Sequence, residues 1–222
     1  MRRGDLLREL EEAYRRYDER LPEWVRESRR RARAIFRELE EGGWPVGRFG
    51  ADFDLLRFRP DIAPERPPRR GFGELPEGMR RQAELAGQRL DERYRAGSKL
   101  QEDATTTYLG FTPACLEGVL CRHPDGLVVK DIEEAVFEYP WLERFWSKIL
   151  PMNLDKYTAY NVGYSRGGIF VWVRKGVQVD LPLQACFFVE TQEYAQLPRI
   201  IVIAEPHSKL HLISGCVTAP AC

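Results

Sequence analysis

The last third of the chain contains short β-rich runs that follow one another with no helical segment between them. Turns rich in glycine, proline and polar residues separate these runs, which recur at intervals of roughly ten residues. Such a pattern favours a β-sandwich, a jelly roll or a β-solenoid, and by itself it leaves the three open. The runs are residues 169–173, 177–183, 185–189, 199–204 and 210–213.

The N-terminal part of the chain has helical periodicity instead. Apolar residues between Leu6 and Tyr17 recur at steps of three and four, which predicts one amphipathic helix. A second helix is predicted from Pro22 to the Gly42-Gly43 pair, packed against the first. Its arginines alternate with glutamates and predict a solvated face; they are Arg26, Arg29, Arg30, Arg31 and Arg33.

The middle of the chain is mixed. Prolines make residues 44–77 an irregular connection, after which residues 77–94 predict a helix and residues 105–109 a strand. Residues 131–150, beginning at Asp131, predict one or two short helices with an inner core stripe of Leu142, Phe145, Trp146 and Ile149. The predicted organisation is therefore a helical region with a proline-rich connection (1–125), a helical lead-in (126–164) and a strand-rich core (165–222).

Charge and cysteine usage exclude several classes of function. Thirty-four basic and 34 acidic residues balance, so we expect neither a nucleic-acid nor a membrane partner. Neither a signal peptide nor a membrane-spanning run is visible, which favours the cytoplasm, and five cysteines without a CxxC pair favour reduced thiols. Residues 215–222 follow a strong strand without a closing helix, so we expect that a partner covers that strand or that the natural chain is longer.

Five blocks between Gly126 and Pro220 resemble the SufB/SufD family of iron–sulfur cluster assembly proteins, and they occur in the family's order. One is Val179-Asp180-Leu181-Pro182-Leu183-Gln184 and another is Gly215-Cys216 followed by Thr218-Ala219-Pro220. The resemblance covers about the N-terminal half of such a protein. The first two blocks lie within residues 126–142 and 155–171, the third adds residues 175–177 to the run 179–184, and the fourth consists of Gln196, Arg199 and residues 200–202.

The resemblance implies an α+β fold, in which an N-terminal helical region precedes the first coils of a right-handed parallel β-helix. It implies a scaffold, not an enzyme, that holds a transient iron–sulfur cluster. The implied partners are a SufC-like ABC ATPase, docked on a C-terminal region outside this chain, a second SufB/SufD-like chain and a sulfur donor protein. A SufD-like subunit that does not itself assemble clusters is the alternative within the family.

Cys216 is the leading candidate for sulfur acceptor or cluster ligand, by its place in the family's Gly-Cys-Thr-Ala-Pro segment. A thiolate is both a nucleophile for sulfur transfer and a soft ligand for iron. Val217 departs from the family pattern and would turn the following side chains over unless a bulge absorbs it. Cys222 is a weaker candidate ligand and Cys186 a predicted packing residue, while Cys115 and Cys121 receive no role.

A cupin-like metal enzyme is the rival hypothesis from the residues alone. His207 and His211 would supply imidazoles and Glu205 a carboxylate, with His123 the remaining histidine. Asp155 and Lys156 predict a helix cap or an ion pair. The sequence holds no Walker lysine motif, GxGxxG fingerprint or GxSxG elbow, so it gives no sign of a nucleotide site or a serine nucleophile.

Overall fold

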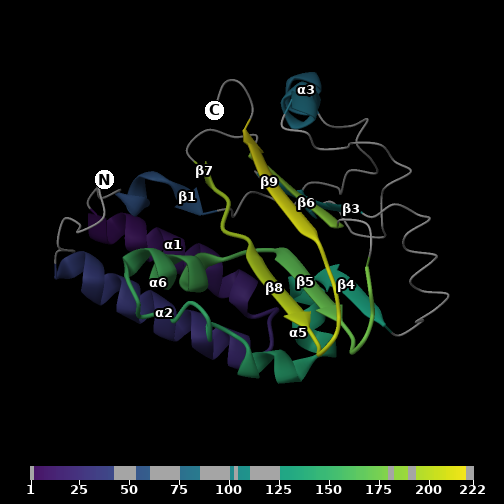
Figure 1. Ribbon diagram of the computed structural model, residues 1–222. Helices are drawn as coiled ribbons and strands as arrows, with labels where there is room; N and C mark the ends of the chain where they lie inside the picture. The colour runs from purple at the N-terminus through teal and green to yellow at the C-terminus, as the bar shows by residue number, and fades with distance from the viewer. Residues whose placement is uncertain are drawn as a thin grey trace.

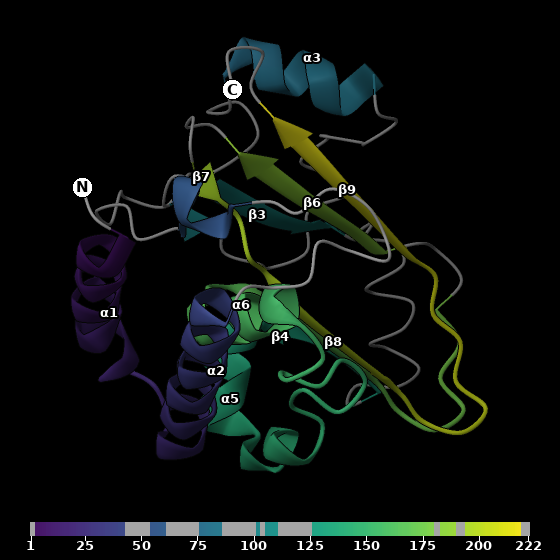
Figure 2. The same ribbon diagram turned by 90° about the vertical axis from the view of Figure 1, so that its left-hand side faces the viewer.

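The computed structural model describes residues 3–42, 54–60, 76–85, 101–102, 105–110, 126–179, 183–189 and 194–218. Helices α1 (Arg3–Asp18), α2 (Glu23–Glu41) and α6 (Lys156–Tyr164) lie together on one side of the molecule, and two sheets lie beside them (Figure 1). A turned view separates the two sheets (Figure 2). Cys115, Cys121, His123 and Cys222, with residues 86–94 and most of residues 44–77, lie outside the described residues.

The two predicted N-terminal helices are confirmed, and they share one aromatic core with α6. Tyr14 of α1, Phe36 of α2 and Tyr160 of α6 are almost completely buried in it. The short helix η1 (Leu55–Arg57) adds Leu56 to the same cluster. Helix α2 ends at Gly42, whose N–H donates to the carbonyl of Glu38. The stripe expected from the sequence is therefore the face on which the helices meet.

The first turn of helix α6 is held by a capping box and by an ion pair to α2. Asp155 accepts a hydrogen bond from the N–H of Thr158, whose hydroxyl in turn accepts from the N–H of Asp155, which makes a capping box. Lys156 is buried and forms an ion pair with Glu40 of α2, at 3.4 Å. The prediction of a cap or an ion pair at these two positions is confirmed, because Asp155 caps α6 and Lys156 links α6 to α2.

The segment from 131 to 154 departs in part from its prediction. Helix α5 (Ile132–Glu138) and the 3-10 helix η4 (Pro140–Arg144) form, and Leu142 is fully buried. Phe145 and Ile149, expected in the core, are 47% and 93% exposed. The reason is that helical geometry stops at Arg144, so a spacing of three and four residues no longer places side chains on one face.

Asp131 caps α5 and gives a pH-dependent prediction. Its carboxylate accepts from the N–H of Glu133 at 2.7 Å, yet burial, and next the charge of Glu133, raise its pKa to about 7. The folded state thus keeps a proton that the unfolded chain loses near pH 4, so the free energy of unfolding should fall as pH rises from about 4 to about 7. Asp131→Asn keeps an acceptor at the cap and removes the charge.

We expect Asp131→Asn to stabilise the protein at pH 8 by about 2 kcal/mol and to flatten its stability profile between pH 4 and 7. Urea unfolding at a series of pH values measures both effects. Glu143→Gln, which removes an exposed charge from η4, is the control and should change stability by less than about 0.5 kcal/mol. A profile that keeps its slope in the Asn variant would contradict the assignment to Asp131.

The strands form two larger sheets and one short pair. One sheet has the order β4-β5-β8, the other the order β2-β3-β6-β9, and β1 (Arg59–Pro60) pairs with β7 (Tyr194–Ala195). Neighbours β4–β5, β2–β3 and β3–β6 are antiparallel, whereas β5–β8 and β6–β9 are parallel. The remaining bounds are β2 Gln101–Glu102, β3 Thr105–Gly110, β4 Leu127–Asp131, β5 Gly168–Val173, β6 Leu183–Val189, β8 Arg199–Ala204 and β9 Leu212–Thr218.

An apolar core fills the space between the two larger sheets. Alternate residues of β5 (169, 171 and 173) and of β6 (183, 185 and 187) are buried in it, as are Val177 and Val179 of the connection between these strands. The opposite face of β5 carries Phe170, which packs with Leu142 and the aromatic side chains around α5 and η4. Strand β5 is therefore buried on both faces, as its almost uninterrupted apolar sequence indicates.

Helix α3 (Glu77–Leu85) completes the described elements. It stands at the far end of β9, away from the α1–α2–α6 layer (Figure 2). Met79 and Ala83 are fully buried. The predicted helix from residue 77 is confirmed over these nine residues.

Candidate functional site

Cys216 lies on β9, the strand at the edge of its sheet. Within that sheet β9 pairs with β6 on one side, and the described residues place no strand on its other side. The thiol is free and exposed to solvent. A cysteine on an open strand edge is accessible both to a sulfur-donating protein and to iron.

The register fixes which face of the sheet carries Cys216. Cys216 pairs with Phe187, and Leu212 pairs with Leu183 in the same parallel ladder. Paired residues share a face, and both Phe187 and Leu183 are buried in the core between the sheets. The register therefore places Cys216 on the inner face, at the point where this core opens to solvent.

Val217 does not interrupt the strand. The pairing of β9 with β6 runs without a bulge from Leu212 to Thr218, and Val217 takes the regular position opposite Phe188. The additional residue is thus accommodated by continuing the strand, which leaves Cys216 in its place on the inner face. We expect that the change of face begins after Cys216 and affects only the residues that follow it.

Among the described strands, β8 and β9 are edge strands of the two larger sheets, and each carries partly exposed apolar side chains on its inner face. On β8, Ile200 and Val202 pair with the buried Ile169 and Val171, yet they are themselves 41% and 40% exposed. On β9, Leu212 is half-buried against the core. Each of the two sheets therefore ends, among the described strands, in an edge strand with partly exposed apolar side chains, and Cys216 lies on one of these two strands, β9.

The residues of the rival histidine site are engaged elsewhere or face solvent. Glu205 accepts from Trp172 Nε1 at 2.9 Å and from the N–H of Lys175 at 2.8 Å, and the hydrogen bond from Lys175 is the main cause of its lowered pKa. His207, with φ of 62°, sits in the turn after β8, and His211 precedes β9; both are exposed. Their backbone carbonyls bind Gln178 and Leu183.

No group of three or more histidine, cysteine or acidic side chains in the described part of the chain could hold a metal ion. The histidine hypothesis thus has no third ligand among these residues, and it also conflicts with the parallel pairing of β5–β8 and β6–β9. None of the helices that the structure describes is both long and apolar enough to cross a membrane. The geometry leaves Cys216 as the candidate for chemistry.

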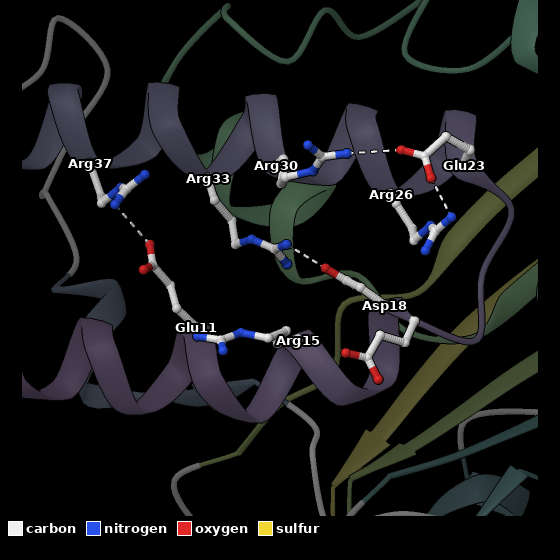
Figure 3. A pocket seen from close by; sticks show the side chains of 9 residues that line it. Glu11, Arg15, Asp18, Glu23, Arg26, Arg30, Arg33 and Arg37 are labelled. Carbon is white, nitrogen blue, oxygen red and sulfur yellow. Dashed lines mark hydrogen bonds and ion pairs between the residues drawn. The ribbon is translucent and has the colours of Figure 1, made fainter.

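The arginine-rich face of α2 is only partly solvated, which corrects the prediction. A groove of about 360 Å³ between α1 and α2 is crossed by ion pairs of Arg37 with Glu11 and of Arg33 with Asp18 (Figure 3). Arg29 and Arg33 are buried, and they share the carboxylate of Asp18. Alternating charge indicates a solvated face, but it equally suits a helix whose arginines reach a buried partner on another element.

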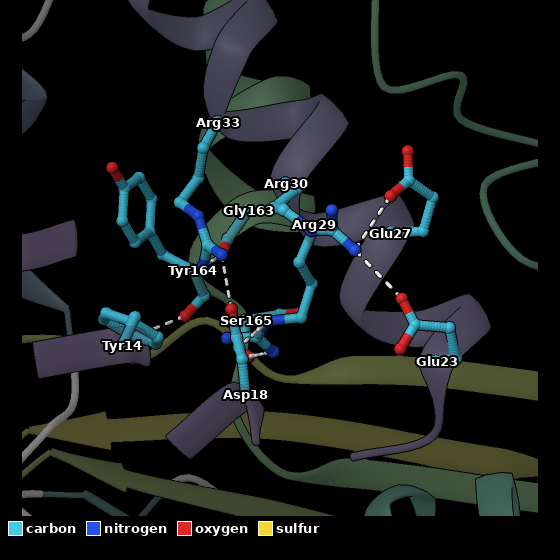
Figure 4. A network of polar contacts seen from close by, with 10 residues as sticks. All are labelled: Tyr14, Asp18, Glu23, Glu27, Arg29, Arg30, Arg33, Gly163, Tyr164 and Ser165. Atoms are coloured by element: carbon cyan, nitrogen blue, oxygen red, sulfur yellow. Dashed lines mark hydrogen bonds and ion pairs between the residues drawn. The ribbon is translucent and has the colours of Figure 1, made fainter. Parts of the chain in front are cut away.

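These buried arginines join α1, α2 and the end of α6. Arg29 Nη1 donates to the carbonyl of Ser165 and Arg33 Nη1 to that of Gly163, at 2.5 and 3.1 Å (Figure 4). Tyr14 donates to the carbonyl of Tyr164 at 2.9 Å. Gly163 lets α2 approach, because a Cβ there would lie 2.8 Å from the Arg33 side chain. The network positions the start of β5 and is structural in character.

No family model matches the chain. Individual known proteins do match it. An iron–sulfur cluster assembly SufBD family protein of Staphylococcus aureus strain MRSA252 is 28% identical over 205 residues. The iron–sulfur cluster assembly protein SufB of Bacillus subtilis strain 168 is 28% identical over 204 residues. Each alignment covers 90% of this chain and 41% of the relative, so the chain spans about two fifths of their length.

Proposed function

This chain is a relative of the SufB/SufD proteins, and we propose that it forms part of a scaffold on which iron–sulfur clusters are assembled. The cluster would be cargo that is held and passed on, with no substrate turned over by the scaffold itself. The observation that carries the proposal is the position of Cys216, a free and exposed thiol on the inner face of an open strand edge. The relatives' names indicate the same process.

We propose that the two parallel strand pairs belong to the first coils of a right-handed parallel β-helix. In support, Gly168 pairs with Arg199 and Leu183 pairs with Leu212, so the chain returns to its own edge after 31 and 29 residues. Two ladders with nearly the same return distance are expected when successive coils stack. Parallel connections within one sheet are almost always right-handed, which favours that hand.

In this proposal the thiolate of Cys216 has two uses. As a nucleophile it attacks the terminal sulfur of a donor's persulfide, takes that sulfur and releases the donor's thiolate. Two electrons from an external reductant would release that sulfur as sulfide and regenerate the thiolate, which is a soft ligand that can hold iron together with the sulfide. The buried side chain of Phe187, which is paired with Cys216 on the neighbouring strand β6, would limit water on one side of a sulfur species at the strand edge. Further ligands would come from residues outside those described.

The proposed partners follow from the family. A SufC-like ABC ATPase would dock on a region outside this chain, a second SufB/SufD-like chain would complete the assembly, and a sulfur donor protein would approach β9. The exposed edge of β9 supports the last of these, because the donor must reach the thiol itself.

We expect Cys216→Ser in the full-length protein to lose most of the sulfur-to-iron charge-transfer absorption that appears after anaerobic reconstitution with iron and sulfide. Serine keeps the size of the side chain but is a poor ligand for iron. Ser214→Ala, two residues earlier on the same strand, is the matched control and should reconstitute like wild type. Equal cluster yield in the Cys216→Ser and wild-type proteins would remove Cys216 from the site.

The SufD-like alternative is supported by one observation, the Val217 departure within the cysteine segment. A subunit of that type would partner a cluster-building chain without building clusters. The same reconstitution separates the two functions, because wild-type protein that gives no iron–sulfur absorption under conditions in which a SufB-type protein does would favour the SufD-like role.

A further inference from the structure

A small cavity lies between α2, α5 and the start of β8. Its volume is about 20 Å³, room for a single water-sized atom. Aliphatic side chains of α2 and α5 form part of its wall, and the polar lining includes Arg29, Trp146 and Arg199. These three come from α2, from the segment after η4 and from β8, so the cavity lies where the helical layer meets the β4-β5-β8 sheet.

Several hydrogen-bond donors of the residues that line the cavity have no acceptor. Arg199 Nε and Nη2, Arg29 Nη2 and Trp146 Nε1 are all buried without a hydrogen-bond partner. Buried polar atoms in native proteins are nearly always hydrogen-bonded, because one left without a partner destabilises the folded state. Four such donors on three residues that line one cavity indicate that the cavity holds an acceptor.

Beside the cavity the guanidinium groups of Arg29, Arg33 and Arg199 outnumber the carboxylates of Asp18 and Glu133, and this excess of positive charge favours an anion over water. Arg199 has no carboxylate partner among the described residues; its guanidinium lies 4.2 Å from the Trp146 ring centroid. Arg29 is paired with Asp18, but Asp18 also neutralises Arg33. Burial, and then the charge of Arg29, lower the pKa of Arg199 to about 10, which leaves it a cation at neutral pH.

Two acceptor atoms of residues that line the cavity, Glu133 Oε1 and the carbonyl oxygen of Ser165, are already used, which counts against a water molecule. Glu133 lines the cavity and accepts from the Tyr17 hydroxyl and from the N–H of Gly167. The carbonyl of Ser165 accepts from Arg29. A water would need acceptors for its own two protons, whereas a monatomic anion needs donors only.

We propose that this cavity binds one monatomic anion of halide size, which is chloride in ordinary buffers, between the guanidinium groups of Arg29 and Arg199. The anion neutralises the charge of Arg199 and accepts from its buried N–H groups. It thereby links α2 to β8 and stabilises the contact between the helical layer and the sheet. The site is structural and independent of Cys216, which lies on β9 in the other sheet.

Thermal unfolding of the 222-residue chain in sodium chloride and in sodium gluconate at equal ionic strength tests the proposal. Gluconate is too large for the cavity, so chloride should raise Tm by about 5 °C in a saturable way and gluconate should not. Arg199→Met should abolish the difference between the two salts. Arg30→Met, which removes an exposed arginine of α2, is the matched control and should keep it.

A crystal soaked in bromide provides a second readout that does not depend on a variant that folds. An anomalous peak between the side chains of Arg29 and Arg199 is the expected result. Equal Tm in both salts, a chloride effect that persists in Arg199→Met, or a bromide-soaked crystal without that peak would overturn the anion site and leave the cavity to water.

Discussion

Replacing Gly168 with alanine is expected to destabilise the protein by about 4 kcal/mol or more, a large fraction of the roughly 5–15 kcal/mol that stabilises a typical domain. Gly168 begins β5 with φ of 130°, a conformation that side chains rarely adopt. A Cβ there would lie 2.0 Å from the carbonyl oxygen of Arg199 and 2.6 Å from its nitrogen. Both are backbone atoms of the paired strand β8, so no side chain can move aside to relieve the clash.

Gly176→Ala separates the two causes of this loss. Gly176 also has a positive φ, of 75°, but a Cβ at this position would meet no atom within 4 Å. It should therefore show only the conformational penalty, about 1 kcal/mol. Urea unfolding of both variants measures the difference, and equal losses would show that the approach of β8 to β5 does not depend on the missing side chain of Gly168.

The elements that local patterns determine could be predicted from the sequence. Helices α1 and α2, and strands β5, β6 and β8, match the predicted segments because apolar spacing and turn residues act over a few positions. The pairing of the strands could not be predicted in this way. The parallel pairs join residues about 30 positions apart, and local periodicity carries no information on such pairs. The alternatives of sandwich, jelly roll and solenoid stayed open in the sequence for that reason.

For the candidate site, the sequence could name a residue but not its surroundings. The family segment pointed to Cys216, whereas its place on the inner face of an open edge required the register of β9 against β6. The pair His207 and His211 was the weaker rival in the sequence, and turn geometry and the hydrogen bonds of Glu205 give these three residues separate roles. A sequence motif can thus identify a candidate residue, but the neighbours of that residue depend on the pairing of strands that are distant in the sequence.

Burial of charge was the feature least accessible to sequence reasoning. Arg29 and Arg33 stand in a run that alternates with glutamates, which is also what an exposed helix shows. Their common partner, Asp18, is the last residue of the preceding helix. The signal that could have found them is position: Arg29 and Arg33 continue the stripe of Val25, Ala32 and Phe36 at helical spacing.

Asp18→Asn is expected to destabilise the protein by about 3–5 kcal/mol, because it leaves two buried guanidinium groups without their counter-ion. The side chains of Arg29, Arg33 and Asp18 are only 3%, 9% and 9% exposed, and Arg29 Nε lies 2.8 Å from Asp18 Oδ1. Asparagine preserves the shape and one acceptor, so the loss reports the missing charge. Chemical denaturation at neutral pH provides the measurement.

Glu23→Gln is the matched control for Asp18→Asn. Glu23 also binds two arginines of α2, Arg26 and Arg30, but its side chain is 67% exposed. Water and salt screen these two ion pairs, so Glu23→Gln should lower the free energy of unfolding by less than about 1 kcal/mol. If both variants lost the same small amount, the Asp18 cluster would behave as a surface ion pair, and the junction of α1, α2 and α6 would rest on its aromatic core alone.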